Sequence, residues 1–167
     1  MKYLIFIELN FIRYTFIHWL GKEQNIIPIK SKRGLKAINS INKGIKACVA
    51  IDIPVLMLSS FFNSLIGNEY EFRNFAFMLQ YVCKTATANG LRIVFESILH
   101  IDRIIKLLNI MRKEFKIYYE TFNPIRCGTG IPVEEIHRIR PDAIDHVHVK
   151  DAPKNMKDYC NLTEGEG

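Results

Sequence analysis

Two carboxylates and an imidazole each follow an apolar run of the chain. Glu96 directly follows LRIVF, Glu120 follows KIYY, and His148 closes IDHVH. If these runs are parallel strands, their carboxyl ends meet at one edge, which is where the active sites of α/β barrels lie. Carboxylate and imidazole groups suit Mn²⁺, Mg²⁺, Co²⁺ or Zn²⁺. A single Glu after a strand is more often a surface residue, but three such groups in consecutive units predict a divalent-metal site.

A second histidine lies two residues before His148. We expect the strand to turn His146 and His148 to opposite faces, with His148 pointing inward and His146 packed or hydrogen-bonded elsewhere.

The elements that must position these groups alternate between helical and strand patterns from residue 31 onward, as in βα units on a parallel sheet. We expect strands over 54–58, 91–96, 116–120 and 144–149, helices through 38–49, 68–88, 101–113 and 132–140, and a loop over 123–130. In the first helix, Ile38, Ile41, Ile45 and Val49 recur at three- and four-residue spacing and should face the core. Asn68 and Glu71 form a capping-box pattern at the start of the second helix.

The spacing of the predicted strands indicates an incomplete barrel. Strands that end at Leu58, Glu96, Glu120 and His148 fit the interval of roughly 31 residues in an eight-unit barrel of about 250 residues. At that spacing the 167 residues make about five or six units. We therefore predict an α/β fold, a partial (β/α) barrel over residues 31–167 that lacks the last strand and one or more early units. Residues 1–30 form an atypical N-terminal segment.

Charge and composition indicate a soluble globular protein. The chain has 23 Lys and Arg against 17 Asp and Glu, a formal charge of +6. The basic residues are dispersed, apart from the run Lys30, Lys32, Arg33 and Lys36, so we expect no nucleic-acid partner. The apolar N-terminus is interrupted by Glu8 and other polar residues, which argues against a signal peptide or a membrane anchor. The four cysteines form no C-x-x-C pair and are typical of reduced thiols, so we expect a cytoplasmic protein.

Several motifs together resemble a known family. They are Ala88-Asn89-Gly90-Leu91 leading into Val94-Phe95-Glu96, then Tyr119-Glu120-Thr121-Phe122-Asn123-Pro124, His146-Val147-His148-Val149-Lys150-Asp151 and Gly165-Glu166-Gly167. On these residues the stretch 51–167 resembles the later part of the xylose isomerase-like TIM-barrel superfamily of sugar and sugar-phosphate isomerases and epimerases. The segment around His148 is the most specific of them.

The resemblance implies a metal held by a Glu, an Asp, a His and a second Glu. Glu96 matches the first Glu and His148 the His, whereas Glu120 stands where the family usually has Asp. The second Glu is expected from a strand beyond Gly167. In such enzymes the metal polarises a ketose carbonyl while two carboxylates exchange a proton through an enediolate, and Glu96 would be one of them.

The resemblance also implies a small sugar or sugar phosphate as partner, and we expect Asn123, Arg126, Lys150 and Asp151 to contact it. Two alternatives remain at this point. One is a non-catalytic fragment of such an enzyme, and the other, less favoured, is a DNA-repair enzyme of the endonuclease IV type, which would need more His and Asp ligands at strand ends. Assembly into a homo-oligomer also stays open.

Overall fold

The structure is a computed structural model of the whole chain that describes residues 14–17, 31–60, 65–111, 113 and 115–151. The Gly165-Glu166-Gly167 motif and most of the segment 1–30 lie outside these residues. The strands are β1 (Tyr14–Ile17), β2 (Val55–Ser59), β3 (Arg92–Glu96), β4 (Phe115–Glu120) and β5 (Ile144–His148). The helices are α1 (Lys32–Ala50), α2 (Glu69–Ala88), α3 (Ile101–Met111), α4 (Asn123–Cys127) and α5 (Pro132–Arg138), with a 3-10 turn at Pro141–Ala143.

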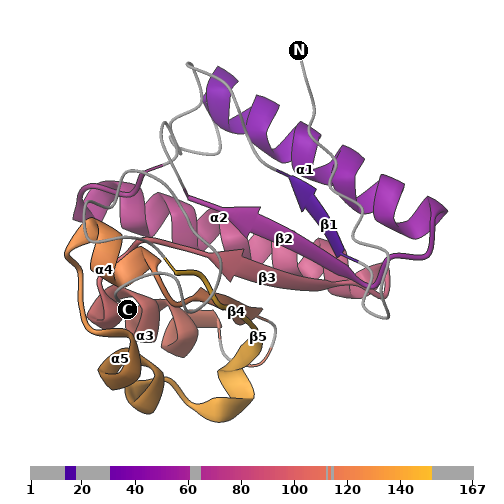
Figure 1. Cartoon of the computed structure of the whole chain (residues 1–167). Coiled ribbons are helices and arrows are strands. Elements are labelled where there is room, and N and C mark those ends of the chain that lie inside the picture. The colour runs from indigo at the N-terminus through magenta and orange to yellow at the C-terminus, as the bar shows by residue number, and fades with distance from the viewer. Residues whose placement is uncertain (1–13, 18–30, 61–64, 112, 114, 152–167) are drawn as a thin grey trace.

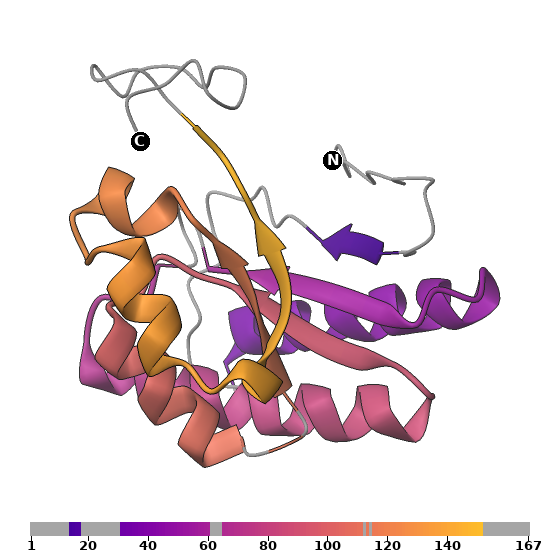
Figure 2. The same cartoon turned by 60° about the horizontal axis from the view of Figure 1, so that its bottom comes forward.

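The five strands form one parallel sheet in chain order (Figure 1). Helices α1, α2 and α3 all lie on one side of the curved sheet (Figure 2). Parallel strands need a crossover between them, and each crossover here carries a helix on the same side, as in a barrel wall. The predicted α/β fold and partial barrel are confirmed, and β1 adds a strand within the segment 1–30.

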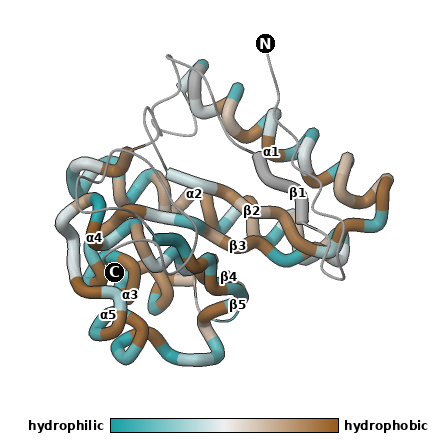
Figure 3. The backbone as a smooth tube through the Cα atoms, in the orientation of Figure 1, coloured by the Kyte–Doolittle hydropathy of each residue, from teal (hydrophilic) through white to brown (hydrophobic). Residues whose placement is uncertain are grey.

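The main core lies between the sheet and its helices. The ring of Phe95 of β3 contacts the tilted rings of Phe75 of α2 and Phe115 of β4, with centroids 4.9 and 5.9 Å away. Figure 3 shows apolar residues along β2 and β3. A smaller cluster, Val55, Met57 and Val94 with Tyr118, lies apart from this core. Successive side chains of a strand point to opposite faces, so the smaller cluster marks the inner face of the barrel wall.

Helix α2 begins as predicted. The Asn68 side chain accepts a hydrogen bond from the Glu71 backbone N–H at 2.9 Å, and the Glu71 carboxylate accepts one from the Asn68 N–H at 3.3 Å. Both groups satisfy backbone donors that a helix start leaves open.

Two local predictions are wrong. Val49 is half exposed, and Cys48 is buried in its place with Ile38, Ile41 and Ile45. Steps of three and of four residues both keep to one face of a helix, so the periodicity alone does not choose between Cys48 and Val49, and the packing against the rest of the core does. Residues 123–127 form the short helix α4 rather than a loop, since Pro124 fits a first turn and Gly128 ends the helix in the left-handed conformation.

Among the described residues no helix is both long and apolar enough to cross a bilayer.

Candidate active site at the carboxyl edge of the sheet

Glu96 and Glu120 are the last residues of the neighbouring strands β3 and β4. Both carboxylates are buried, with 6% and 3% of each residue exposed. Glu96 alternates with Phe95 and Glu120 with Tyr119, both of which belong to the main core, so the two carboxylates lie on the inner face. The structure therefore brings together two of the three predicted metal ligands.

Burial dominates the chemistry of Glu96. It raises the pKa of this carboxyl to about 7, because a charged group loses hydration in the sheet edge. The Glu120 charge adds to the rise, while the Lys150 ammonium and the Asn123 amide oppose it. The Asn123 Nδ2 atom lies 3.5 Å from Glu96 Oε1 and donates to it. Glu96 is thus a carboxyl that exchanges a proton near neutral pH.

The two oxygens of Glu120 have different surroundings. Oε1 accepts a hydrogen bond from the Phe122 backbone N–H at 2.7 Å, which fixes the carboxylate at the start of α4. Oε2 is buried and accepts no hydrogen bond from the described residues, and the Lys150 ammonium lies 3.9 Å from it. Burial raises the pKa of Glu120, and backbone N–H groups and Lys150 oppose the rise. An oriented, buried carboxylate oxygen of this kind is a vacant acceptor for a cation.

Backbone hydrogen bonds hold Lys150 at the carboxyl edge of the sheet. Its N–H donates to Thr121 Oγ1 at 3.2 Å, and the Thr121 N–H donates to the His148 carbonyl at 2.9 Å. These bonds tie the segment after β5 to the end of β4. The ammonium lies 3.9 Å from Glu120 Oε2, and its charge opposes the rise in the pKa of both Glu96 and Glu120.

The other residues predicted to contact substrate differ in how deeply they are buried at this edge. Arg126 is exposed in the last turn of α4, although its charge also opposes the rise in the pKa of Glu120 that burial causes. Asp151 is half-buried, directly after Lys150. Asn123 is the one buried member of this predicted set.

The predicted opposite orientation of His146 and His148 is wrong. In the sheet His146 is opposite Tyr118 and His148 is opposite Glu120. The Tyr118 ring stacks on His146, with centroids 6.1 Å apart, and meets His148 edge-on at 5.9 Å. Side chains repeat every second residue along a strand, so residues two apart share a face. Both imidazoles therefore face the inner side, and His146 Nδ1 lies 2.8 Å from Asp145 Oδ2.

The residues present fit a divalent cation in part. The buried oxygen of Glu120, the nearby Glu96 carboxyl and the register of His148 opposite Glu120 are a donor set of the kind that Mn²⁺ or Zn²⁺ takes. Over residues 31–60, 65–111 and 115–151, however, no three acidic, His or Cys side chains lie close enough together to hold an ion. The carboxylates are in place, and the complete set of ligands is not assembled.

Sequence reasoning missed several residues that support the edge. Ser60 and Ser97 directly follow β2 and β3, and their hydroxyl oxygens lie 3.4 Å apart. Glu135, in the first turn of α5, is buried and accepts a hydrogen bond from the Tyr119 hydroxyl at 2.9 Å. That bond fastens α5 to β4. The signal for the serines was their position after strand ends, whereas nothing local marked Glu135.

Comparisons with known proteins agree with this geometry. The family model described as xylose isomerase-like TIM barrel matches residues 17–167. A curated relative, the 2-epi-5-epi-valiolone 7-phosphate 2-epimerase of Actinoplanes sp., is 29% identical over 118 residues, which cover 70% of this chain and 43% of the relative. The chain thus corresponds to less than half the length of that enzyme.

Solved structures share the fold. A xylose isomerase domain protein from Planctomyces limnophilus superposes with a TM-score of 0.73 at 16% identity, over 92% of this chain and 60% of the other. The IOLI protein, whose structure contains a zinc atom, superposes with a TM-score of 0.63 at 13% identity, over 78% of this chain and 50% of the other.

Proposed function

The chain belongs to the xylose isomerase-like TIM barrel family, and from this premise we propose that it acts as a divalent-metal-dependent isomerase or epimerase of a ketose or sugar phosphate. The curated relative is by its name a sugar-phosphate-type epimerase, which supports the reaction class. The substrate would enter at the carboxyl edge of the sheet, where Glu96 and Glu120 lie.

The main support for the proposal is the raised pKa of the buried Glu96 carboxyl. Epimerisation next to a carbonyl requires a group that removes a proton from carbon and returns it, and such a group works best when its pKa is near the working pH. The buried Glu96 carboxyl has a pKa of about 7 and is oriented by the Asn123 amide. Glu96 would take the proton of the carbon beside the ketose carbonyl and leave an enediolate.

Glu120 and His148, together with Glu96, would hold the metal ion. When bound, the ion supplies positive charge to the oxygens of the substrate. Lys150 would add a second positive charge beside the carboxylates, 3.9 Å from Glu120. We assign Asn123, Arg126 and Asp151 to the substrate side of the site, because they lie on the segments that follow β4 and β5.

The test is proton exchange in heavy water. Ketoses and ketose phosphates are incubated with the chain and Mn²⁺, and proton NMR follows deuterium entering the carbon beside the carbonyl. We expect exchange with the parent chain and a rate lower by about 10²- to 10⁴-fold in Glu96→Gln. Glu134→Gln, which changes an exposed carboxylate of α5, is the matched control and should leave the rate unchanged.

A non-catalytic fragment of such an enzyme is the competing proposal. It is favoured by the absence of a three-ligand group within the part of the chain that the structure describes. A thermal melt with and without Mn²⁺ separates the two. An ion at 100 times its dissociation constant stabilises the folded state by about 2.7 kcal/mol, so a functional site should raise the melting temperature of the parent but not of Glu96→Gln. A cooperative melt indifferent to Mn²⁺, together with no exchange, would establish the fragment.

A further inference from the structure

Helix α1 carries nearly all of the chain's excess positive charge. It contains Lys32, Arg33, Lys36, Lys43 and Lys46 and no acidic residue. Removing these five from the chain's 23 basic residues leaves 18 against 17 acidic residues. Five of the six net positive charges of the chain therefore lie within the 19 residues of α1.

The four lysines share one face of α1. Together with Asn39 they are spaced by four, three, four and three residues, which returns to the same side of a helix. All four lysines and Asn39 are exposed. Ile38, Ile41 and Ile45 are buried on the opposite face. Figure 1 shows α1 at the periphery of the molecule. The result is a straight cationic row, which we call the lysine row, about 21 Å long at 1.5 Å per residue.

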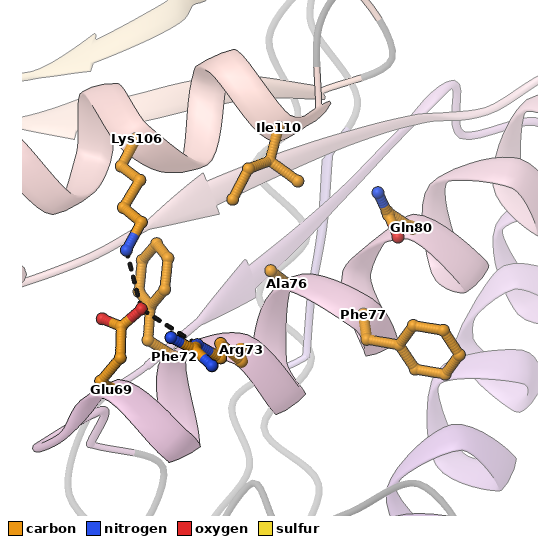
Figure 4. A pocket seen from close by; sticks show the side chains of 8 residues that line it. All are labelled: Glu69, Phe72, Arg73, Ala76, Phe77, Gln80, Lys106 and Ile110. Carbon is orange, nitrogen blue, oxygen red and sulfur yellow. Dashed lines mark hydrogen bonds and ion pairs between the residues drawn. The ribbon is translucent and has the colours of Figure 1, made fainter.

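The lysine row differs from the other helical surfaces. In the groove between α2 and α3, Glu69 accepts hydrogen bonds from Lys106 at 2.7 Å and from Arg73 at 3.3 Å (Figure 4). No carboxylate among the described residues lies within ion-pair distance of the lysine row. The first turn of α1 has no acidic residue, unlike those of α2, α3 and α5.

This arrangement destabilises the helix itself. Lys32 lies in the first turn, where the helix dipole disfavours positive charge, and like charges three or four residues apart, such as Lys32 and Lys36 or Lys43 and Lys46, repel each other. A bound polyanion would relieve both effects. Beside the lysine row, a groove of about 500 Å³ between α1 and α2 is lined by Asn39, Asn42 and Lys46, whose amide and ammonium groups are donors for phosphate oxygens.

We propose that the lysine row and this groove bind the phosphodiester backbone of a nucleic acid without reading its bases. The apolar face of α1 is packed into the core, so the helix cannot insert that face into a membrane as interfacial helices do. The expectation of no nucleic-acid partner rested on the dispersion of basic residues along the sequence, whereas the helix gathers four of them in one row. The proposal is independent of the sugar chemistry at the sheet edge.

The experiment measures binding of a labelled DNA duplex of mixed sequence by fluorescence anisotropy over a range of salt concentrations. If all four lysines contact phosphates, the slope of log K against log salt is about −3.6, and Lys43→Gln/Lys46→Gln should reduce it by about 1.8. Lys43→Arg/Lys46→Arg should retain the slope. The control Arg73→Gln/Lys113→Gln removes the same charge from other surfaces and should also retain it. Circular dichroism verifies that each variant is folded.

Three results would overturn the proposal. The first is no binding to the duplex at low salt. The second is an equal loss of salt slope in the Arg73→Gln/Lys113→Gln control, which would indicate an effect of net charge alone. The third is stronger binding of phosphatidylserine vesicles or polyglutamate than of DNA at equal charge. The last result would assign the lysine row to a membrane or to an acidic protein.

Discussion

The ends of β3 and β4 differ sharply from β5. Each of the first two strands has a paired neighbour on both sides, and their terminal Glu96 and Glu120 are 6% and 3% exposed. Strand β5 pairs with β4 alone among the described strands, and its Val147 is 49% exposed. The carboxylate half of the candidate site is therefore fixed by packing on both sides, whereas the histidine half is supported from one side only.

This difference explains why the donor set is partly assembled. Glu120 is oriented by the N–H of Phe122, the residue before α4, and Glu96 by Asn123, the first residue of α4. His148 depends on its pairing with β4 and on the Tyr118 ring. A neighbour on the outer edge of β5 would be the natural source of the remaining support and of a further ligand.

The largest expected effect is a loss of stability at β3, which has a paired strand on each side. Phe95→Ala removes a fully buried ring that contacts Phe75 and Phe115, and we expect it to lower the free energy of unfolding by roughly 3 to 5 kcal/mol. Urea unfolding followed by circular dichroism measures it. The matched substitution Val147→Ala on β5 should change stability by about 0.5 kcal/mol or less. Equal losses at the two positions would mean that β5 is as well packed as β3.

The next effect concerns the pH dependence of stability. The pKa of Glu96 is about 7 in the folded chain against an ordinary value of 4.5, so its contribution is fully present below pH 4.5 and is lost as the pH rises through 7. Glu96→Gln has no carboxyl to ionise at this position, so its stability does not fall in this way as the pH rises. Relative to the parent, the variant should gain up to roughly 3 kcal/mol between pH 4.5 and pH 8.

Paired urea unfolding curves at several pH values measure this gain. Glu134→Gln serves as the exposed control, and its difference from the parent should be independent of pH. A constant difference for Glu96→Gln as well would show that Glu96 is not desolvated and would remove the main support for its acid-base role.

A smaller effect separates the influence of Lys150 from that of burial. Its ammonium opposes the rise in the pKa of Glu96, so Lys150→Met should raise that pKa above about 7. Carbon-13 NMR titration of the Glu96 carboxyl measures the shift. Lys150→Arg retains the charge and should leave the pKa near its parent value. A lower pKa of Glu96 in Lys150→Met than in the parent would mean that in solution the Lys150 ammonium does not lie near this carboxyl.

Much of this architecture could be predicted from sequence because it depends on local patterns. The strands ending at Glu96 and Glu120 and the capping box at Asn68 depend on apolar alternation and on a three-residue spacing, and both were found. The stagger of the sheet could not be predicted in this way. A bulge between Ile117 and Tyr118 shifts the register of β5, so His148 lies opposite Glu120. The contact of Glu135 with Tyr119 joins residues 16 apart through tertiary packing, which a local pattern does not contain.

The smallest effect on stability is expected at the outer face of β5. Val147 of β5 is 49% exposed and Val149, just after the strand, is 54% exposed, and the other edge of β5 has no partner among the described residues. Exposed apolar side chains on an unpaired edge favour association with another chain, and a lysine there opposes it. Val147→Lys should change the free energy of unfolding by about 0.5 kcal/mol or less, because little apolar area is lost.

If the parent self-associates through this edge, sedimentation velocity should show it as an oligomer and Val147→Lys as a monomer. The control Leu35→Lys, on exposed α1, should leave the oligomer intact. An oligomer that survives Val147→Lys would place the association elsewhere, and β5 would then be an exposed edge that no second copy covers.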